Sequence, residues 1–267
     1  MPNMLELCAD LRAEHADLDS LVDGIDEAAW DTPTPALGWT VRDQVSHLAY
    51  FDDAGARSAT DPDGFRAWVK ESALKEMRPD DGDPADVALG RSMNGPELLE
   101  RWRAGREAMI VEFEPLDPKA RLPWFGPDMG AASFVTARLM ETWAHGQDVA
   151  DGLGVQRTPT ERLRHVCFIG VQARPYAYSV RELQMPDAPL RVEVTSPSGD
   201  VWTFGPAEAS DIVRGSALDL ALVVTQRRHR ADSSLEASGE AADEWLDIAQ
   251  AFAGPPGPGR QPGQFPR

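Results

Sequence analysis

The stretch ARLMETWAHGQDV, residues 137–149, decides how this sequence is interpreted. In an α-helix, positions three, four and seven residues apart share one side, so the four ionisable residues of the stretch fall on one face. Those residues are Arg138, Glu141, His145 and Asp148. The other faces are mainly apolar, which is typical of a largely buried helix. The ionisable face therefore meets either water or a lined internal cavity.

Glu141 and His145 are four residues apart on this face. This spacing points a carboxylate oxygen and an imidazole nitrogen at one spot, about one helical turn apart, which suits two ligands of a single divalent metal ion. The same pattern also occurs on solvated polar faces. From this stretch alone, both interpretations stay open.

The composition limits the partners of the chain. Its 267 residues carry a formal net charge of -18 and a pI near 4.6. Binding to nucleic acid depends on a basic patch that neutralises phosphates, so we expect no nucleic-acid partner and no attachment to an acidic membrane surface. A hydrophobic content of 42% suffices for a sizeable core.

The cysteines and the N-terminus predict a cytoplasmic protein. Cys8 and Cys167 each lie within an apolar helical pattern and form no CxxC motif, so we expect two small core residues in a reducing compartment. The first residues lack the pattern of a secretion signal, and no apolar segment approaches the roughly 20 residues of a membrane-spanning helix.

Residues 1–155 are predicted to form a helical bundle. Long helical patterns cover residues 4–25, the segment that begins after Thr40, residues 95–113 and the central stretch, which Gly152 and Gly154 end. Thr40 is a good N-cap, and Asp43 three residues later makes a near capping box. A short helix over residues 65–77 and a charged loop over residues 78–86 form an excursion, which we place over a pocket.

Two histidines and one loop of this part have open assignments. His15 interrupts the apolar stripe of the first helix, where it is either a core residue or faces the same interior as His145. His47 lies on the margin of the second long helix, as a buried ligand or a half-exposed surface residue. The apolar loop Pro123–Pro127 either lines a site or closes one end of the bundle.

The periodicity changes in the last third of the chain. Thr158–Glu161 has the sequence of a capping box and predicts a helix over residues 159–173. Residues 190–195 and 201–204 form a hairpin pattern, and further short strands and two helices extend to residue 252. We therefore expect a mostly α protein with a four-helix bundle (residues 1–155), a smaller α+β domain (156–253) and a disordered tail (254–267).

Helical bundles build metal sites from side chains on facing helices. If His47 meets Glu141 and His145, the set is two histidines and one carboxylate, with positions left for water or substrate. Three protein ligands with an open position is the arrangement of catalytic zinc. Asp148 would then orient His145 or act as a fourth ligand.

Two segments of the sequence resemble a known family. The segment GWTVRDQVSHL (38–48), followed by RLMETWAHGQD (138–148), is similar to the mycothiol-dependent maleylpyruvate isomerases, which belong to the DinB-like metal-binding bundles. The resemblance covers the bundle and, more loosely, the following α+β domain. It implies that His47, Glu141 and His145 bind a divalent metal ion, usually Zn²⁺, and that the low-molecular-weight thiol mycothiol reaches the open position.

The resemblance also implies a mechanism. The metal ion lowers the pKa of the thiol, and the resulting thiolate adds to an activated cis double bond, permits rotation and is eliminated again. Arg138 is a candidate anchor for a substrate carboxylate, with a salt bridge to Asp148 or Glu141 as the equal alternative. The substrate itself does not follow from the resemblance, because fold likeness does not transfer substrate.

Three functions are therefore compared. The first is a thiol-dependent isomerase or transferase that acts on a small electrophile. The second is a metal-binding protein without turnover, with a storage, sensing or structural role. The third is hydrolysis by a zinc-bound hydroxide, which needs a general base that Glu141 cannot be while it is a ligand. Arg227 and Arg228, near a predicted helix end, are either anion contacts or solvent-facing charges that complement the helix dipole.

Overall fold

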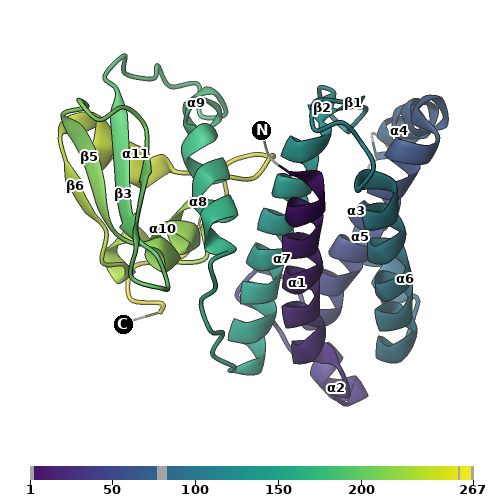
Figure 1. Cartoon of the computed structure of the whole chain (residues 1–267). Helices are drawn as coiled ribbons and strands as arrows, with labels where there is room; N and C mark the ends of the chain where they lie inside the picture. The colour runs from purple at the N-terminus through teal and green to yellow at the C-terminus, as the bar shows by residue number, and fades with distance from the viewer. Residues whose placement is uncertain (1–2, 77–82, 258, 266–267) are drawn as a thin grey trace. The chain divides into compact units, whose positions relative to one another are not determined.

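The computed structural model describes residues 3–76, 83–257 and 259–265. The chain divides into two compact units, Met1–Arg157 and Thr158–Arg267. The first is helical, and the second combines a small sheet with helices (Figure 1). This is the mostly α fold with an α+β C-terminal region that the sequence predicts. Within the described residues, no helix is both long and apolar enough to cross a membrane.

Four long helices form the bundle of the first unit. They are α1 (Met4–Val22), α3 (Val41–Thr60), α6 (Gly95–Phe113) and α7 (Ala131–Leu153). Helix α3 packs against both α6 and α7, and α1 packs against the same two helices, which closes a ring of four (Figure 1). The helix with the ionisable face, α7, therefore adjoins the helix that carries His47.

The bundle has a continuous apolar core. Its largest side chains include Trp30 and Trp102, both almost fully buried, which pack with aliphatic residues of α1, α3 and α6. These core residues are Leu18, Val22, Val41, Val45, Leu48, Leu98 and Leu99. This core includes residues of the first half of α3, and the same helix also buries polar side chains, among them Gln44 and Asp52.

Local sequence signals set the ends of the bundle helices. The Thr40 side chain accepts from the backbone N–H of Asp43, and the Asp43 carboxylate accepts from the Thr40 backbone N–H, so the predicted capping box starts α3. A second capping box, Asn94 with Glu97, starts α6. Gly154 ends α7 in the left-handed conformation, at φ 69°, where glycine has no steric penalty.

Gly105, which interrupts the apolar stripe of α6, has a packing reason. A Cβ atom at this position would lie 2.3 Å from an Asp53 carboxylate oxygen on α3. An alanine at this position would displace the partly exposed Asp53 carboxylate, whereas the glycine costs the helix about 1 kcal/mol relative to Ala.

The connection between α3 and α6 is more helical than predicted. Helix α4 spans Pro62–Glu76 and begins three residues before the predicted start. The predicted charged loop 78–86 overlaps residues 77–82, which lie outside the described residues, and its last two residues belong to α5 (Ala85–Arg91). A short helix, α2 (Glu27–Trp30), and the two-stranded sheet of β1 (Arg121–Leu122) and β2 (Met129–Gly130) complete the unit.

The second unit contains a four-stranded sheet in the order β4-β3-β5-β6. Strand β3 (Leu190–Thr195) pairs antiparallel with β4 (Val201–Phe204), as the hairpin pattern predicts, and parallel with β5 (Asp211–Ser216). Strand β6 (Glu236–Ser238) pairs antiparallel with β5. The helices are α8 (Leu163–Gln172), α9 (Arg174–Ser179), α10 (Ala217–Val224), the 3-10 turn η1 (Arg230–Asp232) and α11 (Glu240–Ile248).

Two helix boundaries in this unit were predicted wrongly. The expected capping box at Thr158–Glu161 does not start a helix, because the Glu161 carboxylate accepts from the backbone N–H of Ser198 and α8 begins at Leu163. The last helix ends at Ile248 and does not reach Phe252. The predicted disorder of residues 254–267 stays a prediction, although Gly254 and Gly263 hydrogen bond to Tyr176 and Asp232.

Candidate functional site

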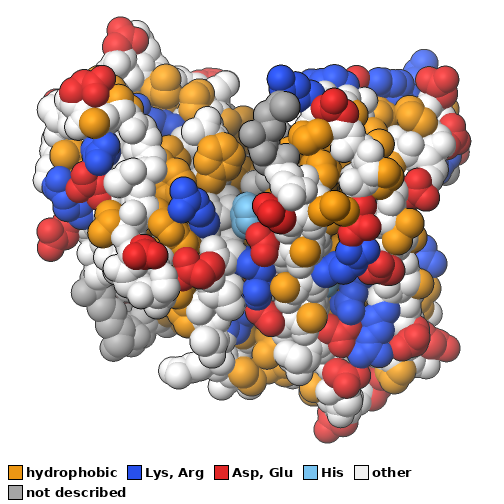
Figure 2. Space-filling view, in the orientation of Figure 1, with side chains coloured by type: hydrophobic (Ala, Val, Ile, Leu, Met, Phe, Trp, Pro, Cys, Tyr) orange, Lys and Arg blue, Asp and Glu red, His pale blue; other side chains and the backbone are white. Residues whose placement is uncertain are grey.

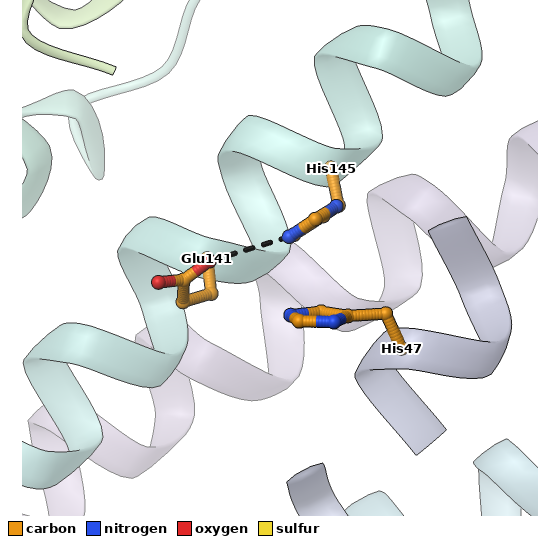
Figure 3. A group of neighbouring side chains, drawn as sticks. All are labelled: His47, Glu141 and His145. Carbon is orange, nitrogen blue, oxygen red and sulfur yellow. Dashed lines mark ion pairs between the residues drawn. The ribbon is translucent and has the colours of Figure 1, made fainter. Parts of the chain in front are cut away.

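His47, Glu141 and His145 come together in the first unit. Helix α3 supplies His47, and α7 supplies the other two. Each residue offers one ligand atom, and these atoms all lie within 4.8 Å of one another. Figure 3 shows the three side chains pointing toward a common position. Among the described residues, no second group of three His, Cys, Asp or Glu side chains has this geometry.

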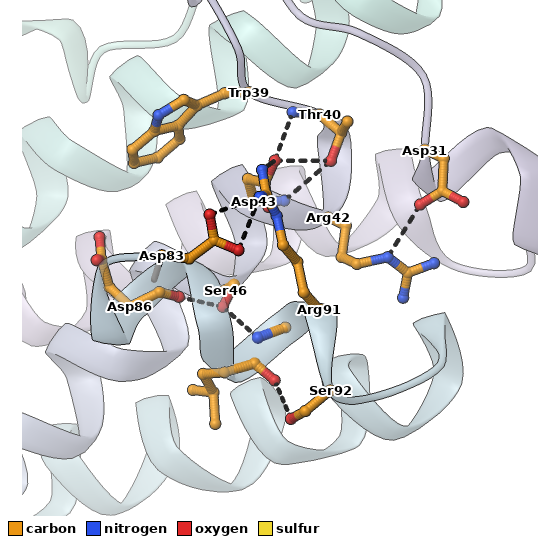
Figure 4. Close-up of polar contacts among 12 residues, drawn as sticks. Asp31, Trp39, Thr40, Arg42, Asp43, Ser46, Asp83, Asp86, Arg91 and Ser92 are labelled. Atoms are coloured by element: carbon orange, nitrogen blue, oxygen red, sulfur yellow. Dashed lines mark hydrogen bonds and ion pairs between the residues drawn. The ribbon is translucent and has the colours of Figure 1, made fainter. Parts of the chain in front are cut away.

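The ring of His47 is held by a carboxylate. Its Nδ1 lies 2.7 Å from Oδ2 of Asp86, in the first turn of α5. Ser46 fixes α5 beside this contact, because its hydroxyl donates to the backbone carbonyl of Asp86 and accepts from the Gly90 N–H (Figure 4). Burial alone would raise the pKa of Asp86, but the hydrogen bond and the charge of His47 lower it. An ionised Asp86 accepts the Nδ1 proton, which leaves Nε2 of His47 as the ligand atom.

The ring of His145 is held by an amide. Its Nδ1 hydrogen bonds to Oε1 of Gln44, one turn before His47 on α3. The Gln44 amide nitrogen in turn donates to the Thr34 hydroxyl over 2.9 Å. Since an amide oxygen only accepts, Nδ1 of His145 carries a proton, and Nε2 is the ring nitrogen left to face Glu141 or a metal ion. Both histidines thus present Nε2 to the cluster.

Glu141 is the anionic member of the cluster. Its Oε2 lies 3.3 Å from Nε2 of His145, and its side chain is 23% exposed. Burial would raise the pKa of Glu141, but the hydrogen bond to His145 and the positive charges of His145, His47 and Arg138 outweigh burial and lower the pKa to about 2. The carboxylate is therefore ionised at neutral pH, as a metal ligand must be.

Asp148 and His15 lie outside this cluster. Asp148 is buried on α7 but is not among the three residues whose ligand atoms converge. His15 is also buried, with Nε2 3.7 Å from Oδ2 of Asp52 and its ring edge-on to Trp102. Burial and the nearby Arg106 hold the pKa of His15 well below its usual value, so this histidine is neutral.

Arg138 forms a buried ion pair with a residue that the sequence did not indicate. Its Nε donates to Oδ1 of Asp52 over 3.0 Å, and a terminal nitrogen of its guanidinium lies 2.9 Å from the same oxygen. The other carboxylate oxygen of Asp52 accepts from the Trp102 indole over 3.0 Å. The pair joins α3 to α7 near the cluster. The substrate-anchor role of Arg138 stays a prediction.

Aromatic rings flank the two histidines. The Trp39 ring is stacked against His145, with 5.9 Å between centroids, and lies 5.4 Å from the His47 ring. On the other side, Phe51, one turn after His47 on α3, has its centroid 4.6 Å from the His47 ring. The loop that carries Trp39 is tied to the site, because the Thr34 hydroxyl that holds Gln44 also donates to the Trp39 carbonyl.

The sequence contains a signal for only some of these supporting residues. Gln44 precedes His47 by three positions and Phe51 follows it by four, so helical periodicity alone places both on the face of His47. Asp86 carries no such signal, because it comes from a separate helix 39 residues later. Asp52 also has no local signal in the sequence, since its partner Arg138 is 86 residues away.

Fold and cluster together define the class of the protein. It is a helical bundle whose facing helices direct imidazole and carboxylate groups to one point, followed by a small α+β unit. Residues 11–150 match the family described as the mycothiol maleylpyruvate isomerase N-terminal domain. The chain belongs to this family, as the resemblance in the sequence predicts.

The chain is also similar to two curated relatives and to two solved structures. The chain is 46% identical to the uncharacterized protein Rv0036c of Mycobacterium tuberculosis H37Rv and to MT0041 of strain CDC 1551, over 94% of this chain and 97% of each relative. Two crystal structures of the mycothiol-dependent maleylpyruvate isomerase, one of them of a mutant, are similar at TM-scores of 0.58 and 0.57. Each covers 89% of this chain and 93% of the other, at 17% identity, so this likeness concerns the fold.

Proposed function

We propose that the protein is a thiol-dependent isomerase or transferase that binds a divalent metal ion, Zn²⁺ by preference, through His47, Glu141 and His145. The observation that carries the proposal is the convergence of these three ligand atoms within 4.8 Å, with Nδ1 of each histidine already engaged. Two neutral imidazoles and one carboxylate fit a catalytic zinc site, which keeps an open coordination position.

A metal ion at this site would lower the pKa of a bound thiol and so favour the nucleophilic thiolate. The residues of the chain supply the setting for this chemistry. Asp86 and Gln44 fix the tautomer and orientation of the histidines, and Glu141 contributes a negative charge that leaves the loaded site with a single net positive charge. That remaining charge matches one thiolate.

The thiol must come from outside the chain. Cys8 and Cys167 are both fully buried, and neither belongs to the cluster. Burial raises the pKa of Cys8 to about 11 and that of Cys167 to about 12, so neither supplies a thiolate at neutral pH. The family assignment favours mycothiol as the cosubstrate.

The proposed reaction is reversible addition of this thiolate. Sulfur forms a bond to one carbon of an activated cis double bond, and the electron pair of that bond moves to the activating carbonyl group. Rotation about the resulting single bond and loss of the same thiolate then give the trans product. In a transferase, a proton instead traps the adduct. All atoms of the thiol are recovered in the isomerisation.

The test is catalysis by the metal-loaded protein. We expect the protein with one equivalent of Zn²⁺ and mycothiol to convert dimethyl maleate to dimethyl fumarate, or to its thiol adduct, faster than mycothiol alone, as followed by NMR. His145→Ala should abolish the acceleration. Stable binding of Zn²⁺ without acceleration for any thiol would contradict turnover and favour the alternative, a metal-binding protein with a storage, sensing or structural role.

A further inference from the structure

A set of aromatic side chains extends from the histidines into the segments that surround the bundle. Phe51, whose ring touches His47, lies 5.3 Å from the ring of Phe125 and 6.0 Å from that of Trp124. Both belong to the apolar loop 123–127. We define the aromatic surface as the five partly exposed rings that continue from His47, namely Tyr50, Phe51, Trp68, Trp124 and Phe125.

The aromatic surface is anchored by the bundle. The Trp124 ring packs edge-on against Phe134 of α7 at 4.5 Å and is stacked on the fully buried Phe65 of α4 at 5.8 Å. Trp68 of α4 packs against Phe125 at 5.6 Å. The loop 123–127 therefore closes one end of the core, and its rings also continue the aromatic surface next to His47. Both of the alternative assignments of this loop thus apply.

Large aromatic side chains are highly buried on average, but these rings keep contact with solvent. Phe125 is 39% exposed, and the His47 side chain itself is 19% exposed. A molecule held near His47 and Glu141 is thus adjacent to apolar ring faces that can remove its own apolar surface from water.

The cation that could bind a carboxylated substrate on α7 is already engaged. Arg138 is the only Lys or Arg in α7, and its guanidinium is buried against Asp52. The two side chains that hold the histidines, Asp86 and Gln44, offer no positive charge. The setting of the cluster therefore favours a neutral apolar group over a carboxylate.

Building on the proposed function, we propose that the substrate of this site carries a neutral aromatic or extended apolar group, which packs on Phe51, Trp124 and Phe125 beside the metal ligands. This assigns a specificity-determining role to the aromatic surface. It also separates the substrate from a small dicarboxylate on the ring faces next to His47, whereas the guanidinium of Arg57 lies over Trp68, 5.3 Å from the centroid of that ring.

Thiol binding to the Co²⁺-loaded protein tests this proposal without turnover. The visible absorption of bound Co²⁺ is recorded first, and the sulfur-to-metal charge-transfer band then gives the affinity of three probes: benzyl mercaptan, 2-mercaptoethanol and mercaptosuccinate. We expect benzyl mercaptan to bind about tenfold more tightly than 2-mercaptoethanol, because its ring is buried on the aromatic surface. Mercaptosuccinate should gain nothing from its two carboxylates.

Substitutions test whether the aromatic surface causes this preference. Phe125→Ala should weaken the binding of benzyl mercaptan about three- to tenfold and leave the affinity for 2-mercaptoethanol unchanged. If this variant folds poorly, Trp68→Ala serves as the second variant. The matched control is Leu5→Ala, an exposed apolar residue on α1. Equal affinities for the three thiols, or tightest binding of mercaptosuccinate, would overturn the role of the aromatic surface and leave the proposed function standing. Failure to take up Co²⁺ would overturn the proposed function with it.

Discussion

At the scale of single residues, the site depends on how each histidine is turned. Nδ1 of His47 faces Asp86 and Nδ1 of His145 faces Gln44, so each ring has one nitrogen committed and Nε2 directed to the cluster. Such partners raise the basicity of a ligand and fix its tautomer. Spacing in the sequence predicted the pair Glu141 and His145, but no local pattern indicated Asp86.

Substitution of Asp86 therefore tests whether its hydrogen bond to His47 contributes to metal binding. Asp86→Asn should weaken binding of Zn²⁺ about 10- to 100-fold with the fold retained, because His47 loses its charged partner. Competition with a chromophoric chelator measures the affinity. Asp83→Asn, which removes an exposed carboxylate that pairs with Arg91, is the control and should leave the affinity unchanged. Equal effects of the two substitutions would show that Asp86 acts only through α5.

The two cysteines give a pH-dependent prediction. Because burial raises the pKa of Cys8 to about 11 and of Cys167 to about 12, the thiolate fraction of each at pH 8 lies far below that of an ordinary thiol. Ellman's reagent should leave both unmodified in the native protein at pH 8 and label both in denaturant. Rapid stoichiometric labelling of the native protein would contradict the burial of these residues and the requirement for an external thiol.

At the scale of elements, the relation of α3 to α7 decides whether the cluster forms. The Asp52–Arg138 ion pair joins these two helices, and Arg138 lies on the face of α7 that carries Glu141 and His145. Burial raises the pKa of Asp52, although the charge of Arg138 opposes this effect. A buried pair of this kind contributes little net stability, but removal of one partner leaves an uncompensated charge in the core.

We therefore expect Arg138→Met to lower the free energy of unfolding by about 3–5 kcal/mol, as measured by urea denaturation. The double variant Arg138→Met with Asp52→Asn should recover part of this loss. Arg101→Met, which breaks the exposed pair with the neighbouring Asp53, serves as control and should cost less than about 1 kcal/mol. A small effect of Arg138→Met, or no recovery in the double variant, would contradict a charged link between the helices.

Elements were predictable from sequence where the signal is local and intrinsic. The bounds of α6, the N-cap of α3 at Thr40 and the C-cap of α7 at Gly154 follow from caps and periodicity. The helix expected from residue 159 begins instead at Leu163, and Glu161 of the expected capping box accepts from the backbone N–H of Ser198, a contact that no local pattern indicates. Helix α5, which supplies Asp86, lies in a charged segment without clear periodicity.

At the scale of the whole molecule, several arginines of this strongly acidic chain form ion pairs between helices. On the face drawn in Figure 2, basic and acidic side chains are interspersed over the bundle. Arg103 and Arg106 of α6 both pair with Asp19 of α1, and Arg12 pairs with Glu107 and Glu114. Such pairs link α1 and α6, which are neighbouring helices of the bundle.

The division after Arg157 predicts an independent first unit. The first unit, Met1–Arg157, contains the three proposed ligands, Gln44, Asp86 and the apolar core of the bundle. We expect the fragment of residues 1–157 to unfold cooperatively in urea and to bind one equivalent of Zn²⁺. A fragment that lacks a cooperative transition would show that the bundle requires the second unit.

The metal content of the purified full-length protein tests the central claim most directly. Elemental mass spectrometry should find close to one equivalent of Zn²⁺ or a similar ion in the wild type, and none in His47→Ala or His145→Ala. His165→Ala, a histidine of α8 outside the cluster, should retain the full equivalent. Absence of metal from the wild-type protein after reconstitution, or unchanged content in both cluster variants, would contradict the assignment of His47, Glu141 and His145 as ligands.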